Sequence, residues 1–141
     1  MSQMNWDREV DVLVVGTGNG GLTAAVCNWE MGTKNVLIIE KQDKVGGTSA
    51  TSGGGIWIPN SHYAKEVGAE DSPEAAKAYL MNTLFGEDVP EEMIDIYLEK
   101  APEMLKYLHD RTDVRYESLA EDPDYYTNME GAREGHRSLE P

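Results

Sequence analysis

The sequence has little of what a disulfide-rich, nucleic-acid-binding or membrane-spanning protein needs. Only one of its 141 residues is cysteine, so no disulfide can form within the chain and no cysteine-based zinc site is available. Basic residues are few, 12 against 26 acidic ones, and a net charge of −14 would repel a phosphate backbone. No eighteen apolar residues run together, and residues 1–9 lack the apolar segment of a signal peptide. We therefore expect a cytoplasmic protein without a transmembrane segment or a nucleic-acid partner.

Histidine is also sparse, and its positions do not predict a metal site. His62, His109 and His136 form no pair at the i, i+4 spacing with which a helix presents two ligands. The lone Cys27 lies among helix formers, where packing is its expected role. No nucleophile elbow, Cys/His pair or Walker sequence occurs. The sequence therefore predicts neither a metal centre nor a nucleophilic triad.

The acidic residues are concentrated in the second part of the chain. Residues 1–65 carry five basic and six acidic side chains, whereas residues 66–141 carry seven and twenty. A nearly neutral, glycine-rich first part suits an anionic cofactor, and the acidity of the second part is typical of a solvated surface. We predict a cofactor-binding portion over residues 1–65 and an acidic helical segment over residues 66–141.

Two aliphatic runs on either side of a glycine-rich turn predict a βαβ unit. Residues 10–15 (VDVLVV) and 35–40 (NVLIIE) have the aliphatic character of strands that are buried on both faces of a parallel sheet. Between them, residues 22–31 contain good helix formers, and Gly32 supplies a stop. This order predicts an α/β fold with a Rossmann-like unit and a right-handed crossover.

The turn after the first strand matches a dinucleotide-binding motif. Gly16, Gly18 and Gly21 have the G-x-G-x-x-G spacing, which allows a tight turn, close approach to a pyrophosphate and packing of the helix on the strand. The helix N-terminus favours the negative pyrophosphate. Glu40, nineteen residues after Gly21, can accept hydrogen bonds from the adenosine ribose hydroxyls and argues against a 2′-phosphate. The cofactor contacts predicted in this region are Gly16, Gly18, Asn19, Gly20, Gly21, Glu40 and Lys41.

A second glycine-rich tract favours a flavin dinucleotide over a nicotinamide one. Residues 46–55 (GGTSATSGGG) contain five glycines and four hydroxylated residues, so no ordinary helix is expected there. Backbone N–H groups and hydroxyls can hold a second part of a long cofactor, and glycine lets the backbone approach a flat isoalloxazine ring. The tract contains no histidine for covalent flavin attachment, so we predict noncovalent FAD. The contacts predicted in this tract are Gly46, Gly47, Thr48, Ser49, Ser52, Gly53 and Gly54.

The second part of the chain predicts two helices and a weakly patterned end. Ser72 and Pro73 start a helix that extends to about Phe85, and an amphipathic helix begins near Pro90. Pro102 is expected to kink or divide this second helix. After residue 110 the patterning fades and no closing element is predicted, so we expect an incomplete domain with an open sheet edge and exposed apolar surface.

Three segments together resemble a flavoprotein family. DVLVVGTGNGGLTAA, IEKQDKVGGTSATSGGGIWIP and PDYY are similar to the fumarate reductase and succinate dehydrogenase superfamily, and within it to the 3-ketosteroid dehydrogenases. The resemblance implies noncovalent FAD, two domains, and removal of two hydrogens from ring A of a 3-oxosteroid with hydride transfer to flavin N5. It also implies that Tyr125 is an active-site tyrosine supporting a second tyrosine that acts as the base, and that residues 66–141 begin the substrate-site region.

Three functions stay open at this point. The leading one is an FAD-dependent oxidoreductase acting on a small 3-ketosteroid-like molecule. Its base and carbonyl donors would lie beyond Pro141, so we expect the isolated chain to be inactive unless a complementing chain supplies the C-terminal part. A fumarate-reductase-like flavoprotein would need clustered Arg and His to bind a dicarboxylate, and no such cluster is visible. The third possibility is a nonenzymatic fragment that binds a dinucleotide.

Overall fold

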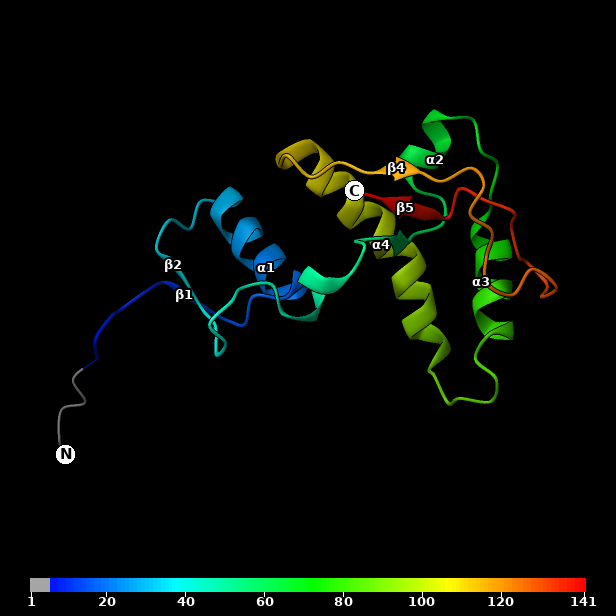
Figure 1. Cartoon of the computed structure of the whole chain (residues 1–141). Coiled ribbons are helices and arrows are strands. Elements are labelled where there is room, and N and C mark those ends of the chain that lie inside the picture. The colour runs from blue at the N-terminus through cyan, green and yellow to red at the C-terminus, as the bar shows by residue number, and fades with distance from the viewer. Residues whose placement is uncertain (1–5) are drawn as a thin grey trace. The chain divides into compact units, whose positions relative to one another are not determined.

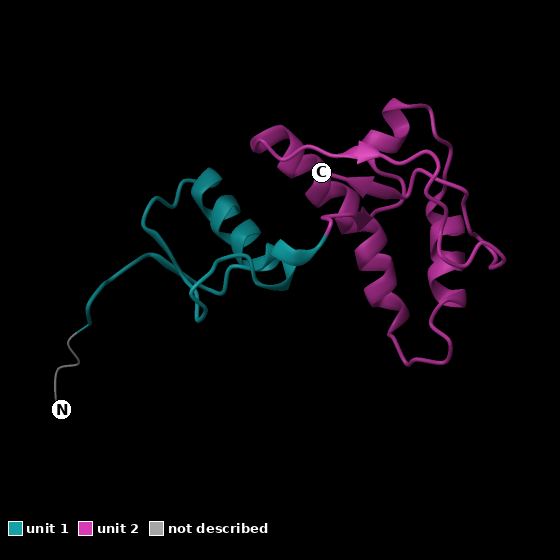
Figure 2. Ribbon diagram, viewed as in Figure 1, with its two compact units in different colours: residues 1–52 teal, residues 53–141 magenta. Residues whose placement is uncertain are grey.

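Figure 1 shows the elements of the chain in a computed structural model, which describes residues 6–141. The chain forms two compact units, residues 1–52 and residues 53–141, which are coloured separately in Figure 2. We call them unit 1 and unit 2 and describe each by itself. No helix of the described residues is long and apolar enough to cross a membrane.

Unit 1 contains a short parallel sheet and its crossover helix. Strand β1 (Val12–Val15) leads into helix α1 (Asn19–Glu30), which returns the chain to strand β2 (Val36–Ile39). The strands pair in parallel, with Val12 opposite Val36 and Val15 opposite Ile39. A 3-10 turn, η1 (Gly47–Thr51), follows. The predicted combination of helix with parallel sheet is confirmed, although α1 begins three residues earlier than expected and includes Gly20 and Gly21.

The prediction that the first strand is buried on both faces is wrong within unit 1. Only Val14 of β1 is buried, whereas Val15 is 76% exposed and Leu13 is also exposed. The reason is that α1 packs beside Val14, and neighbouring side chains of a strand point to the opposite face. Ile38 and Ile39 of β2 are exposed as well. The exposed apolar surface that we expected from the sequence therefore lies on this sheet.

Unit 2 packs three helices with a small antiparallel sheet. The strands are β3 (Ile56–Trp57), β4 (Glu117–Ser118) and β5 (Ser138–Glu140), in the order β3-β5-β4. The helices are α2 (His62–Glu66), α3 (Pro73–Asn82) and α4 (Glu91–Arg111). The core consists of Ile58, Tyr63, Ala101, Leu105 and Leu139. As predicted, Ser72 caps α3, because its hydroxyl accepts a hydrogen bond from Ala75 N at 3.1 Å.

The structure differs from two sequence expectations in unit 2. Pro102 was expected to kink or divide its helix, and the division is wrong, because α4 continues through Pro102 with the buried residues Ala101 and Leu105 on either side of it. The weakly patterned end does contain a regular element, because β5 is the central strand of the small sheet and its Leu139 is fully buried. A three-residue strand with a single buried leucine is too short to give a readable alternation in the sequence.

Candidate functional site

The first glycine-rich turn is tightly closed. Gly16 has a φ of +98°, which favours glycine, and its N–H extends the sheet by donating to Ile39 O at 2.7 Å. A Cβ atom on Gly21 would overlap the Gly16 carbonyl oxygen, so only glycine lets α1 lie this close to the turn. The first turn of α1 thus presents N–H groups with no acceptor inside the helix, as the pyrophosphate of a dinucleotide requires.

Glu40 is held as an anion at the end of β2. Its Oε2 accepts hydrogen bonds from Thr17 Oγ1 at 2.5 Å and Thr17 N at 3.0 Å, and its Oε1 accepts from Lys41 N at 2.8 Å and Gln42 N at 3.1 Å. The Thr17 hydroxyl, followed by the backbone N–H groups, lowers the pKa of Glu40 to about 2. A fixed negative charge suits ribose hydroxyls and would repel a 2′-phosphate.

The second glycine-rich tract lies against the first. Gly46 N donates to Thr17 Oγ1 at 2.8 Å, and Asn19 N at the start of α1 donates to Ser49 Oγ at 3.2 Å. A Cβ on Gly47 would be in ordinary van der Waals contact with Gly18 Cα, at 3.6 Å. Unit 1 therefore contains most of the predicted cofactor residues, namely 16, 18–21, 40–41, 46–49 and 52, whereas Gly53 and Gly54 belong to unit 2.

Thr17 is the residue of this site that the sequence did not reveal. It occupies a variable position of the glycine motif, yet its side chain is only 4% exposed and joins both glycine-rich segments to Glu40. Nothing in the motif requires a hydroxyl at that position, so only the folded arrangement identifies it. These residues fit the ADP half of a dinucleotide, because they combine glycine close approaches, helix N–H groups and a preformed carboxylate.

Unit 2 contains a cavity of about 590 Å³ with an aromatic lining. Trp57, Tyr79, Phe85 and Tyr126 contribute rings to its wall, and Tyr125 also lines it. The Tyr125 side chain is 98% exposed, so its phenol is free to meet a molecule that enters. The lining, which belongs entirely to the described residues, includes Asp122, Asp124 and Glu140 but no lysine, arginine or histidine.

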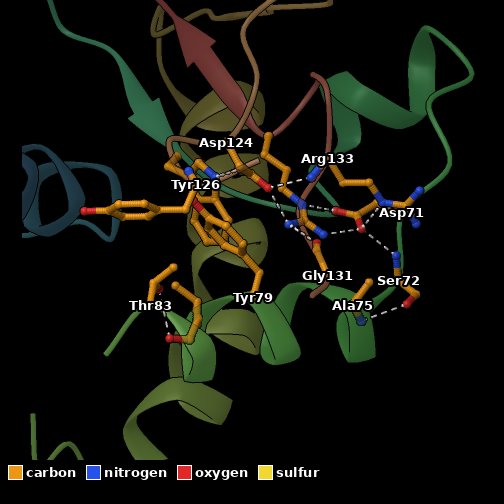
Figure 3. A network of polar contacts seen from close by, with 12 residues as sticks. Asp71, Ser72, Ala75, Tyr79, Thr83, Asp124, Tyr126, Gly131 and Arg133 are labelled. Carbon is orange, nitrogen blue, oxygen red and sulfur yellow. Dashed lines mark hydrogen bonds and ion pairs between the residues drawn. The ribbon is translucent and has the colours of Figure 1, made fainter. Parts of the chain in front are cut away.

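A buried ionic network holds the loop that carries Tyr125 (Figure 3). The Arg137 guanidinium is 2% exposed and binds Asp71 through Nε at 2.8 Å and Nη2 at 2.7 Å. Its Nη1 donates to Asp124 Oδ2 and to Gly131 O, both at 2.8 Å. Burial alone would raise the pKa of Asp71, but the hydrogen bonds and charge of Arg137 outweigh it and lower that pKa. The network thereby joins the start of α3 to the residue preceding Tyr125.

Aromatic side chains complete the support of this loop. The indole N–H of Trp57 donates to Asp124 Oδ1 at 2.6 Å, and Tyr126 N donates to the Tyr79 hydroxyl at 3.3 Å. Arg137 Cζ lies 5.6 Å from the Trp57 ring centre and 5.8 Å from that of Tyr79, within cation–π range. These contacts could not be predicted from the sequence, since the residues that make them are up to 67 positions apart.

Two of the scattered histidines meet in unit 2. The rings of His62 and His109 are 4.9 Å apart, and His109 Nδ1 is 2.8 Å from the Tyr63 hydroxyl. Burial, then the neighbouring His109, lowers the pKa of His62, which favours its neutral form. The described residues contain no group of three or more His, Cys, Asp or Glu side chains that could hold a metal ion.

Comparisons with known proteins agree with this geometry. The chain is 42% identical to the 3-oxosteroid 1-dehydrogenase of Mycobacterium tuberculosis, over 95% of this chain and 23% of that protein. It is 39% identical to the 4-oxocyclohexanecarboxylate 2-dehydrogenase of Sinomonas cyclohexanicum, over 93% and 22% respectively. The crystal structure of 3-ketosteroid delta1-dehydrogenase from Sterolibacterium denitrificans, in complex with 1,4-androstadiene-3,17-dione, matches with a TM-score of 0.83 and 41% identity, over 94% and 23%.

The chain thus spans less than a quarter of the length of these relatives. The match to a protein family covers nearly all of it, because residues 11–140 correspond to the family described as the FAD binding domain. This range includes the glycine-rich turn, Glu40, the second glycine-rich tract and Tyr125. FAD is accordingly the cofactor for which the site is built, and the chain belongs to the FAD binding domain family.

Proposed function

We propose that this chain is the FAD-binding and substrate-facing part of an oxidoreductase that dehydrogenates a 3-ketosteroid-like cyclic ketone. One observation carries the proposal: an exposed tyrosine, Tyr125, lines an aromatic cavity in a chain that also contains a preformed ADP site. The named relatives support it, since a 3-oxosteroid dehydrogenase and a 4-oxocyclohexanecarboxylate dehydrogenase both act on a ring that carries a ketone.

The residues of unit 1 would bind and orient the cofactor. The N–H groups at the start of α1 would take the pyrophosphate, Glu40 the ribose, and residues 46–52 the flavin side. When bound, FAD supplies a two-electron acceptor for a hydride. We infer that this binding is noncovalent and that the β1–α1–β2 unit is Rossmann-like.

The residues of unit 2 would receive the substrate. The tilted rings of Trp57 and Tyr79, whose centres are 5.8 Å apart, offer an apolar wall to a fused-ring molecule and exclude water from it. Tyr125 would contact the substrate and support a second tyrosine that abstracts the proton beside the ketone. We infer that this base belongs to a further segment or a complementing chain. We also infer that residues 1–65 serve mainly the cofactor, and that residues 66–141, together with Trp57, serve the substrate. A cytoplasmic location also stays a prediction.

The rival reduction of a dicarboxylate is disfavoured by charge. A dicarboxylate needs arginine or histidine partners, whereas the charged residues in the wall of the cavity are Asp122, Asp124 and Glu140. Arg137 is close to this wall but is committed to two aspartates. The cavity would therefore repel a dianion and accept an uncharged ketone.

The test is a titration of the 141-residue chain, loaded with FAD, with 4-androstene-3,17-dione and separately with fumarate. We expect the steroid to quench or shift Trp57 fluorescence in a saturable way, and fumarate to have no effect. A Trp6→Phe, Trp29→Phe background makes Trp57 the only tryptophan. Saturable binding of fumarate without binding of the steroid would refute the proposed substrate class. Adding the remaining part of a homologous 3-oxosteroid dehydrogenase should then give steroid-dependent bleaching of the flavin.

A further inference from the structure

The Thr17 hydroxyl forms hydrogen bonds with two segments that are distant in the sequence, as donor to one and acceptor from the other. A hydroxyl has one proton to donate and lone pairs with which to accept. Thr17 donates its proton to Glu40 Oε2 at 2.5 Å, and its oxygen accepts from Gly46 N at 2.8 Å. Its partners lie 23 and 29 positions further along the chain. Since Thr17 itself belongs to the first glycine-rich turn, one side chain connects three segments of the cofactor site.

The bond to Glu40 fixes the direction of the carboxylate. Oε2 receives both the hydroxyl and the backbone N–H of Thr17, whereas Oε1 receives only the neighbouring N–H groups of Lys41 and Gln42. The latter donors belong to the same strand end as Glu40 and move with it. Thr17 is therefore the group that ties the carboxylate to the glycine-rich turn, where the ADP half of FAD would lie.

The bond to Gly46 fixes the entry of the second tract. Gly46 has a φ of +111°, and a Cβ there would lie 2.5 Å from Ala50 Cβ, so the backbone turns sharply at this residue. Its N–H points to the Thr17 oxygen rather than to a backbone carbonyl. Thr17 thus fixes the position of Gly46, the first residue of the second glycine-rich tract, which would receive the flavin side of FAD.

We propose that Thr17 is a positioning residue that couples the two halves of the FAD site, because its hydroxyl orients Glu40 toward the ribose and anchors Gly46 in the second tract. This inference rests on FAD being the ligand of the site. The hydrogen bonds of Thr17 to Glu40 and Gly46 are present without any bound ligand. It follows that losing the hydroxyl weakens FAD more than it weakens ADP, since ADP uses only the first half.

The experiment compares Thr17→Val, which keeps the shape without the hydroxyl, with Thr17→Ser, which keeps the hydroxyl. Thr33→Val, at a half-buried threonine of unit 1, is the control. Calorimetric titration of the 141-residue chain with ADP should show about tenfold weaker binding for Thr17→Val, with a larger loss for FAD. Thr17→Ser and Thr33→Val should bind both ligands as the wild type does.

Amide hydrogen exchange in the ligand-free chain gives a second readout. The Gly46 amide should exchange at least about tenfold faster in Thr17→Val and normally in Thr17→Ser. The Gly16 amide, which bonds to Ile39 O, should keep its protection in every variant and so report an intact unit 1. Unchanged exchange at Gly46 in Thr17→Val would overturn the proposed link.

The binding measurements distinguish a failure of the proposed role of Thr17 from a failure of the FAD site itself. If Thr17→Val binds ADP and FAD with the same affinities as the wild type does, the positioning role of Thr17 is overturned, while the assignment of the cofactor site is unaffected. Tighter ADP binding by Thr17→Val also overturns it, because the hydroxyl would then compete with the ribose for Glu40. If the wild-type chain binds neither ADP nor FAD, the cofactor site fails together with the role of Thr17 in it.

Discussion

Replacing Arg137 with methionine should destabilise unit 2 severely. The change removes a guanidinium that is 2% exposed; it leaves the Asp124 carboxylate without its cation and leaves Asp71 with only the more exposed Arg133, at 3.4 Å. The Asp124 side chain is itself 1% exposed. Breaking a buried ion pair on one side costs about 3–5 kcal/mol, because the remaining charge stays buried and unpaired.

This cost is large compared with the stability of a small domain, which is about 5–15 kcal/mol. In a domain of this size each kcal/mol lowers Tm by about 4–8 °C, so Arg137→Met should melt at least about 12 °C below the wild type. The assay is the thermal unfolding of unit 2, followed by Trp57 fluorescence in the Trp6→Phe, Trp29→Phe background. Trp57 is a local probe because its indole donates to Asp124.

Lys77→Met is the matched control. Lys77 also joins two acidic residues, Glu91 at 2.7 Å and Asp95 at 2.6 Å, but both carboxylates are solvent-exposed. Exposed ion pairs contribute little because water and salt screen them, so this variant should shift Tm by no more than a few degrees. If Arg137→Met melts at the wild-type temperature, or no lower than Lys77→Met, the buried Arg137 network does not stabilise unit 2 by about 3–5 kcal/mol and the reasoning is refuted.

The pH dependence of Tm gives a second test of the stabilising role of the Arg137–Asp71 ion pair. Arg137 holds the pKa of Asp71 below its ordinary value against the opposing effect of burial. For a carboxyl with a lowered folded-state pKa, the stabilisation is complete above the unfolded pKa and is lost as the pH falls through the folded value. In Arg137→Met most of this stabilisation is lost, although Ser72 N and Arg133 still favour the ionised Asp71. The Tm difference between variant and wild type should therefore narrow as the pH falls below about 4, where Asp71 becomes protonated first in the unfolded and then in the folded chain.

Three further predictions concern the glycine turn, the tyrosine and the cofactor. Gly21→Ala should lower the stability of unit 1 to urea and Gly20→Ala should not, because a Cβ at residue 21 overlaps Gly16 O whereas one at residue 20 meets nothing within 4 Å. Tyr125→Phe should leave Tm unchanged, since the Tyr125 side chain is exposed. It should slow steroid-dependent flavin bleaching in the complemented protein. A lower Tm would contradict the exposed position of the Tyr125 side chain. Saturating FAD should slow amide exchange at Gly16 in unit 1, and an exchange rate independent of FAD would oppose this.

How far the sequence predicted the structure depends on how far apart the interacting residues are. The β1–α1–β2 order follows from a local pattern of apolar residues and glycine, and its parallel pairing follows from the crossover. The α3 start is local too, because Ser72 and Pro73 form a capping signal by themselves. These features depend on neighbours within a few residues, which a single sequence displays.

The features that the sequence did not predict depend on distant partners. Arg137 gives no sign of Asp71, which lies 66 positions away, and Thr17 gives no sign of Gly46. Strand β5 is missed for a similar reason, since its three residues become a central strand only through pairing with β3 and β4. Pro102 shows the limit of a local rule, because burial of α4 on both sides of the proline keeps the helix continuous.

The two units are stabilised in different ways, which links the cofactor to the folding of the chain. Unit 2 has a core around Leu105 and Leu139 and a buried ionic network, whereas few side chains of unit 1 are buried and much of its sheet is exposed. A two-stranded sheet with one helix has marginal stability of its own. Within these residues, polar links such as that of Thr17 stabilise unit 1, and bound FAD would add to that stability. Because a ligand that binds only the folded form stabilises it, the same hydrogen bonds that shape the ADP site make cofactor binding and the folding of unit 1 a single coupled equilibrium.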